Sequence, residues 1–180
     1  SYSTEASEAE FETEGTSDAL TIKKYKGTSQ VVDLTKLFSG SHVVAIGQDA
    51  FRNNTSVKEV ILPDTITSIG ICAFQDCKNL TTIKGTGNVT QIGNYAFIRC
   101  EQLASFDSTN ATMIGQEAFR ECKSLQKFVI AEGTTQIAAG AFYASGLLEV
   151  TLPSTCKEIG VNAFRETLLT EITIPDECLT

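Results

Sequence analysis

The sequence predicts a solenoid of the α/β class, in which about six stacked repeats each contribute short parallel strands and a short helical turn. The first observation behind this prediction is a motif, Ile-Gly-x-x-Ala-Phe, that recurs along the chain and departs from its pattern only at Ala138, in place of Gly. Its phenylalanines are Phe51, Phe74, Phe97, Phe119, Phe142 and Phe164. They are spaced by 23, 23, 22, 23 and 22 residues, and a fixed period of about 20–50 residues is the signature of repeat folds.

The second observation is that apolar residues between the motifs repeat in step with them. In segments such as Val60-Ile61-Leu62-Pro63, alternate side chains point to the same side, so Val60 and Leu62 are expected in the core. Proline lacks an N–H donor and therefore ends such a strand. A second short segment, for example residues 66–69, precedes each Ile-Gly pair. Each repeat is thus expected to hold two short extended segments.

The motif itself has a physical interpretation. The glycine permits a sharp or positive-φ turn, and the x-x-Ala-Phe piece fits one short helical turn whose phenylalanine points inward. One repeat of this length cannot bury its own apolar face, whereas stacked copies cover one another. We expect a column of six phenylalanines in the core, each contributing roughly 1.5–3 kcal/mol of burial.

The net charge of −8 is unevenly distributed. Residues 1–19 contain six acids and no Lys or Arg, and the rest of the chain has 16 acids and 14 bases. The Ser/Thr/Glu-rich stretch 1–19 lacks apolar periodicity, so it is interpreted as a disordered acidic linker. Such a linker commonly remains after a secretory leader is removed, or tethers a domain to a surface. A nearly neutral body has no electrostatic footprint for nucleic acid, and no apolar run is long enough for a membrane-spanning helix.

The repeat pattern LxxIxIPxxVxxIGxxAFxxC resembles the BspA-like leucine-rich-repeat family of bacterial cell-surface proteins, over about residues 40–175. Residues 20–40, with Tyr25-Lys26-Gly27 and Val31 to Leu34, resemble the strand-rich entry before the first repeat and are interpreted as an N-terminal cap. Residues 41–180 would then form the solenoid. The resemblance implies a right-handed leucine-rich-repeat solenoid with a parallel sheet on its concave side. It also implies an extracellular or surface location and a role in adhesion or protein binding.

The sequence offers little for catalysis, and we predict that the chain is not an enzyme. His42 is the only histidine and is expected at the surface, although a Cys–His dyad with Cys77 stays open at this point. The chain contains no Gly-rich phosphate loop and no nucleophile elbow. We therefore predict no cofactor.

The six cysteines raise the possibility of disulfides or a zinc site. Cys77, Cys100 and Cys122 follow the motif phenylalanine by three residues in successive repeats, so they should form a column with steps of about 4.8 Å. Three sulfurs in such a column are too far apart to share one zinc ion, and parallel Cβ vectors are poor for a disulfide. Cys156 and Cys178 are also equivalent to each other. Both sets are interpreted as small buried hydrophobic residues, and no metal site is predicted.

The leading functional hypothesis is a non-enzymatic surface or secreted module that binds a protein or glycan, in adhesion to host or other cells. The alternative is a structural spacer within a larger cell-surface protein. A partner is expected on solvent-facing strand positions of the concave face, which could equally be no more than a solvated strand face. The predicted contact residues are Lys58, Glu59, Ile61, Thr82, Lys84, Asp107, Lys127, Glu149, Thr151 and Glu171.

Overall fold

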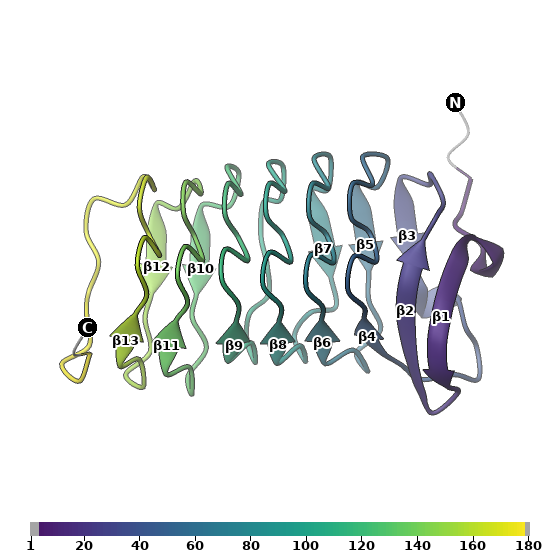
Figure 1. The fold of residues 1–180 in the computed structure, drawn as a ribbon, viewed down its shortest axis with the longest axis horizontal. Coiled ribbons are helices and arrows are strands. Elements are labelled where there is room, and N and C mark those ends of the chain that lie inside the picture. Colours follow the sequence, from purple (N-terminus) through teal and green to yellow (C-terminus); the bar gives the residue numbers. More distant parts are fainter. Residues whose placement is uncertain (1–3, 179–180) are drawn as a thin grey trace.

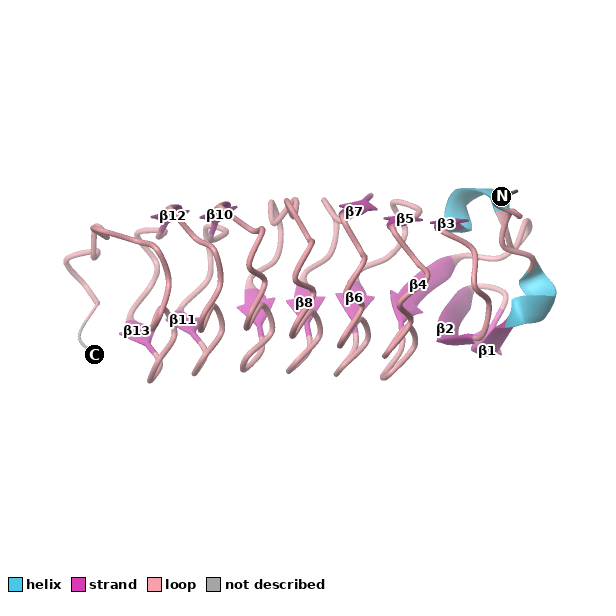
Figure 2. Ribbon diagram, turned by 90° about the horizontal axis from the view of Figure 1, so that it is seen from above, coloured by secondary structure: helices cyan, strands magenta, loops and turns pink. Residues whose placement is uncertain are grey.

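The chain forms a row of stacked turns, each of which runs once around the long axis (Figure 1). The computed structural model describes residues 4–178. Two strips of short strands run along different sides of the stack (Figure 2). The first strip comprises β3 (Val31–Asp33), β5 (Glu59–Ile61), β7 (Thr82–Lys84), β10 (Lys127–Val129) and β12 (Glu149–Thr151). The second strip comprises β2 (Ala19–Tyr25), β4 (Val43–Ile46), β6 (Ser68–Ile69), β8 (Gln91–Ile92), β9 (Met113–Ile114), β11 (Gln136–Ile137) and β13 (Glu158–Ile159).

The repeat strands pair in parallel with the equivalent residues of the next turn. Val60 of β5 is opposite Ile83 of β7, and Ile69 of β6 is opposite Ile92 of β8. Both registers place one apolar side chain of each turn directly over that of its neighbour, inside the stack. The predicted parallel strands, with Val60 and Leu62 buried, are therefore confirmed.

A column of phenylalanine rings fills the centre of the stack. Successive rings from Phe51 to Phe164 lie nearly parallel, with centroids 4.8, 5.1, 5.2, 5.5 and 5.6 Å apart. The first five are fully buried, and Phe164 is half-buried. The column predicted from the motif spacing is thus confirmed, and its rings are separated by about one strand spacing.

The predicted helical turn in each repeat is wrong. Among residues 4–178 the only helices are two 3-10 segments near the N-terminus, η1 (Glu8–Glu10) and η2 (Leu34–Lys36). In every repeat the second residue after the motif glycine and the second after the phenylalanine have positive φ, for example Asp49 and Asn53. Residues in this left-handed region cannot continue a right-handed helix. The Phe51 N–H instead donates to Ala73 O of the next turn, at 2.7 Å, so this edge forms a further ladder between turns.

The motif glycine has a role different from the expected one, because positive φ occurs at other positions. A Cβ atom on Gly70 would lie 2.7 Å from the backbone nitrogen of Gln48 in the preceding turn. At Gly93 and Gly115 the corresponding distances are 2.6 and 2.5 Å. Glycine is therefore required at this point because two backbones approach too closely for any side chain.

The N-terminal region also corrects a prediction, since much of residues 1–19 belongs to the fold. β1 (Phe11–Thr16) pairs antiparallel with β2, and β2 pairs in parallel with β4. The Phe11 ring lies 4.6 Å from that of Tyr25, which lies 5.4 Å from that of Phe51. The cap thus extends the aromatic column and covers the first repeat. Residues 1–3 of the expected linker lie outside the described residues.

Both strips are interrupted near the middle of the stack. In the first strip, residues 104–107 form no strand between β7 and β10. This repeat is one residue shorter than its neighbours, and the missing residue falls between Phe106 and Ala111, which are five apart where Val60 and Ile66 are six apart. The loss of this strand thus coincides with the shorter connection that follows it.

The second strip is interrupted between β9 and β11, where Ala138 replaces the motif glycine. Gly115 N–H donates to Ile92 O at 2.9 Å and Gly160 N–H to Ile137 O at 2.7 Å. The equivalent bond from Ala138 to Ile114 is missing from this described part of the chain. A methyl group at the point of closest approach forces the two turns apart, whereas the ladder along the turn edge continues from Phe119 N–H to Ala141 O. Figure 2 shows the wider step between the turns of β9 and β11.

Replacing Phe97 by alanine should destabilise the protein by about 3–5 kcal/mol, because it removes a fully buried ring from the middle of the column. The measurement is urea denaturation followed by circular dichroism. The control is Val161→Ala, which truncates a side chain that is 71% exposed and should change stability by less than about 0.5 kcal/mol. If the two variants have the same free energy of unfolding, the phenylalanine column does not stabilise the fold.

Replacing Thr134 by valine should stabilise the protein by about 1 kcal/mol. Thr134 is buried in the position that Val89 occupies in another repeat, and its hydroxyl has no hydrogen-bond partner. The matched control is Thr86→Val, because the buried Thr86 hydroxyl donates to Asp107 O at 2.8 Å. Denaturation midpoints should rise for the first variant and fall for the second, and a fall in both would show that the Thr134 hydroxyl is satisfied in solution.

Candidate functional site

The first strip carries the predicted contact residues, and none of them is buried. Most lie in aligned columns, because Glu59 is opposite Thr82, Ile61 opposite Lys84, and Lys127 opposite Glu149. Glu59, Ile61 and Thr82 are half-buried, and the other seven are exposed. Asp107 and Glu171 lie outside any strand. The interruption at residues 104–107 therefore divides this surface into two pieces.

Charges on the first strip are partly neutralised by pairing between neighbouring turns. Lys84 Nζ lies 2.9 Å from Glu59 Oε1, and Lys127 Nζ lies 3.7 Å from Glu149 Oε2. Exposed pairs of this kind contribute little to stability. Their main consequence is that each piece of the strip presents mixed charge and not a field of one sign.

A long hollow lies over the second strip. It is a groove of about 850 Å³ that crosses five turns, from β6 to β13. It spans the widened step between β9 and β11. Its lining alternates amides, hydroxyls and apolar groups: Ser68, Ile69, Gly70, Ile71, Gln91, Ile92, Gly93, Asn94, Thr112, Met113, Ile114, Gly115, Gln116, Thr135, Gln136, Ile137, Ala138, Ala139, Glu158, Gly160 and Val161.

The groove differs from the rest of the surface in its chemistry. Glu158 is the one charged residue among the described residues that line it, although 20% of the chain is charged. Ile71, Met113 and Val161 expose 43%, 60% and 71% of their surface there. Depletion of charge together with exposed apolar groups is typical of the core of a protein interface.

A small notch opens from the groove toward the turn edge. Ala139 and Gly140 stand where other repeats have larger residues, and they line a cavity of about 280 Å³ between the turns on either side. Ala139 and Val161 line both the notch and the groove. The Arg120 guanidinium closes one side of the notch and lies 4.7 Å from the centre of the Tyr143 ring.

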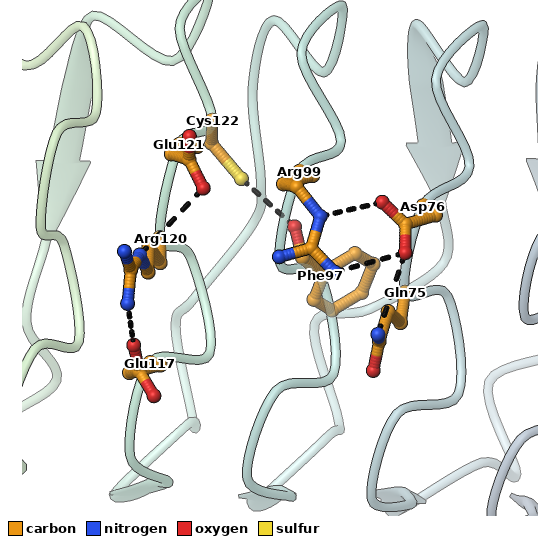
Figure 3. Close-up of polar contacts among 8 residues, drawn as sticks. All are labelled: Gln75, Asp76, Phe97, Arg99, Glu117, Arg120, Glu121 and Cys122. Atoms are coloured by element: carbon orange, nitrogen blue, oxygen red, sulfur yellow. Dashed lines mark hydrogen bonds and ion pairs between the residues drawn. The ribbon is translucent and has the colours of Figure 1, made fainter.

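Ion pairs hold charged side chains along the turn edge (Figure 3). Arg99 binds Asp76 of the preceding turn through two hydrogen bonds, of 2.6 Å to Oδ1 and 3.0 Å to Oδ2. This bond to Arg99 lowers the pKa of the Asp76 carboxyl below its usual value. Arg120 pairs with Glu117 and lies 3.6 Å from Glu121 Oε2 within its own turn. None of these paired side chains belongs to the lining of the groove.

The cysteine column is buried, as predicted, and its thiols have a structural role. Cys77, Cys100 and Cys122 each donate to the phenylalanine carbonyl of the preceding turn, at 3.0, 3.0 and 3.1 Å. Burial raises the pKa of the Cys77 thiol to about 12 and that of the other two well above the usual value. A thiol that holds its proton so firmly is a poor nucleophile.

Cys77 and His42 do not form the dyad that the sequence left open. His42 is exposed, and the Cys77 thiol that could have partnered it is committed to Phe51 O. Within residues 4–178, no three His, Cys, Asp or Glu side chains lie in a metal-binding arrangement. In the same range, no helix is long and apolar enough to cross a membrane.

Sequence reasoning did not identify the groove, although two signals for it were present. The break at Ala138 was visible as the only departure from glycine in six repeats. The Ala-Ala-Gly run at residues 138–140 also marked the repeat with the smallest side chains at these positions. The sequence could not predict that replacing this glycine would remove the hydrogen bonds between β9 and β11 and leave those along the turn edge in place.

Comparison with known proteins identifies the repeats. The sequence model described as the BspA type leucine rich repeat region, in six copies, matches residues 26–145 and 112–180. A leucine rich cell surface protein of Faecalibacterium prausnitzii has a similar structure, with 30% identity and a TM-score of 0.83 over 96% of this chain. The chain spans about half of that protein's length, 49%.

A second solved structure is also similar along most of its length. The leucine rich repeat protein of T. pallidum is 26% identical, with a TM-score of 0.68, and the match covers 87% of this chain and 86% of that one. No curated protein shows a significant match.

The thiol column gives a prediction on pH. The Cys77 thiol has a pKa of about 12 when folded and near 9 when unfolded, so its contribution to stability is complete below about pH 9 and is lost as pH rises toward 12. Urea midpoints should therefore fall between pH 8 and pH 10.5. The fall should be smaller in the variant Cys77→Val/Cys100→Val/Cys122→Val, and an equal fall would mean that other groups cause it.

Proposed function

The chain belongs to the BspA-type leucine-rich-repeat family, and we propose that it is a binding module of a cell-surface protein whose partner docks in the groove over the second strip. The observation that carries this proposal is the groove itself, which is long, nearly uncharged and bordered by exposed Met113 and Val161. The relative from F. prausnitzii is described as a cell surface protein, which supports an extracellular location for this chain.

The chemistry of the groove favours an uncharged, extended protein segment as the partner. The amides of Gln91 and Gln136 can each donate to and accept from peptide groups. The exposed apolar side chains between them can contact apolar side chains of a partner. A charged partner would lose its hydration on entering the groove and find few opposite charges to compensate. A glycan is a less suitable ligand for the apolar part of this lining.

The first strip is the second candidate surface. Lys58, Glu59, Ile61, Thr82, Lys84, Asp107, Lys127, Glu149, Thr151 and Glu171 present mixed charge and hydroxyl groups along the stack. The exposure of its charged residues and their columnar alignment support a role in contact with a partner. The self-pairing of its charges and the interruption at residues 104–107 favour the groove over this strip.

A structural spacer is the second candidate function. The match to only 49% of the F. prausnitzii protein supports it, because a module of this kind can hold another domain away from the cell. In that case the groove would be a by-product of the Ala138 substitution. Binding measurements separate the two functions.

The proposed test is binding of the purified chain to a panel of purified matrix and serum proteins, measured by biolayer interferometry. For a protein that binds, Met113→Glu/Val161→Glu should weaken affinity by about tenfold or more, because it places charges in the apolar part of the groove. Both side chains are more than half exposed, so the fold should be retained. Leu168→Glu, at a residue that is 61% exposed and outside the groove lining, is the matched control and should bind normally.

A further variant distinguishes the two surfaces. Lys84→Ala/Lys127→Ala/Glu149→Ala removes three exposed charges of the first strip and leaves the groove unchanged. Loss of binding in this variant alone would assign the interface to the first strip. No binding to any protein of the panel would favour the spacer.

A further inference from the structure

The end of the described chain brings two cysteines together inside the stack. Cys156 is buried, and Cys178 is half-buried against the same core. Their backbones form the same turn, because Cys156 N–H donates to Pro153 O at 3.1 Å and Cys178 N–H to Pro175 O at 3.0 Å. Burial raises the pKa of the Cys156 thiol, and the nearby Cys178 thiol raises it further. The two cysteines thus occupy equivalent positions of two successive turns, close enough to influence each other.

We infer that Cys156 and Cys178 are a site of disulfide formation, which would covalently join the last two described turns. Both cysteines pack against the same core at equivalent positions of successive turns, and a disulfide between them requires Cα atoms roughly 4.4–6.8 Å apart. This pairing goes beyond partner binding and does not depend on it. Disulfides persist in the oxidising surroundings of surface proteins, the location proposed above.

The local structure explains why this pair can react while the column of Cys77, Cys100 and Cys122 cannot. Those three thiols are fully buried, and each donates to a phenylalanine carbonyl at 3.0–3.1 Å. Cys156 is buried as well, but its thiol makes only a longer contact, 3.7 Å, with Glu158 O. Residues 171–174, by contrast, form no strand with β12, so the turn that carries Cys178 can adjust to the geometry of a disulfide. Cys178 is also partly accessible to a reagent in solvent.

The reaction requires an external oxidant, for which a small-molecule disulfide such as oxidised glutathione is suitable. Cys178 loses its proton to solvent and attacks one glutathione sulfur, which releases the first glutathione thiolate and leaves a mixed disulfide. Cys156 then loses its proton and attacks the Cys178 sulfur, which releases the second glutathione. Two protein thiols are oxidised, and one glutathione disulfide is reduced to two thiols.

The test uses the whole chain, reduced and then incubated with oxidised glutathione at pH 8. Remaining thiols are blocked with iodoacetamide in guanidinium, and the protein is digested with trypsin without reductant. Lys157 and Arg165 lie between the two cysteines, so their peptides separate unless a disulfide joins them. Mass spectrometry should find the joined pair, lighter by two hydrogens than the sum of the reduced peptides. In the oxidised protein, amide hydrogen exchange at residues 168–178 should slow by about tenfold.

The same digest contains its own control. Lys78 and Arg99 lie between Cys77 and Cys100, so a disulfide there would be detected equally well, and none is expected. Cys156→Ser should leave Cys178 as a mixed disulfide with glutathione or as an alkylated thiol. The inference is overturned if both cysteines of the parent are recovered alkylated, or if Cys178 carries only glutathione. It is also overturned if Cys77 and Cys100 are joined as readily.

Discussion

The structure depends on the close approach of successive backbones at the Ile-Gly step. A Cβ atom on Gly70, Gly93 or Gly115 would lie within 2.7 Å of the preceding turn. This approach sets the separation of the turns, and several other contacts require it. The phenylalanine rings can stack at 4.8–5.6 Å, and each column thiol can reach a carbonyl one turn away, only because the turns are one strand spacing apart. No single repeat could bury its phenylalanine without the next.

Where this constraint is relaxed, the surface changes. Ala138 adds one methyl group at the point of closest approach, and the ladder between β9 and β11 is lost on that side. The turn edge keeps its hydrogen bonds, so the stack stays continuous while one face opens. The proposed binding groove crosses this step. A local loss of packing between repeats can thus create a surface feature without interrupting the core.

The distribution of charge follows from the same geometry. Equivalent positions of successive turns are neighbours, so opposite charges that alternate between repeats pair along the stack. The pairs Lys84–Glu59 and Arg99–Asp76 both arise in this way. They hold charges on the first strip and the turn edge, whereas the groove over the second strip is lined by amides, hydroxyls and apolar groups, with Glu158 as its one charge among the described lining residues. The low charge of the proposed binding face therefore results from uncharged residues that recur at equivalent positions of several turns.

The sequence alone determined the repeat, its period, the phenylalanine column and the buried cysteines, because each depends on which residue types recur at one spacing. It could not determine the conformation of the x-x-Ala-Phe turn, whose N–H groups bond to the next turn and not within a helix. It also misassigned residues 1–19, because β1 is held by backbone pairing to β2 and buries only Phe11. The predicted contact residues do lie on one strip, but the groove was decided by tertiary structure. Its position depends on how far apart two backbones stand, and that distance is set by contacts between residues more than twenty positions apart.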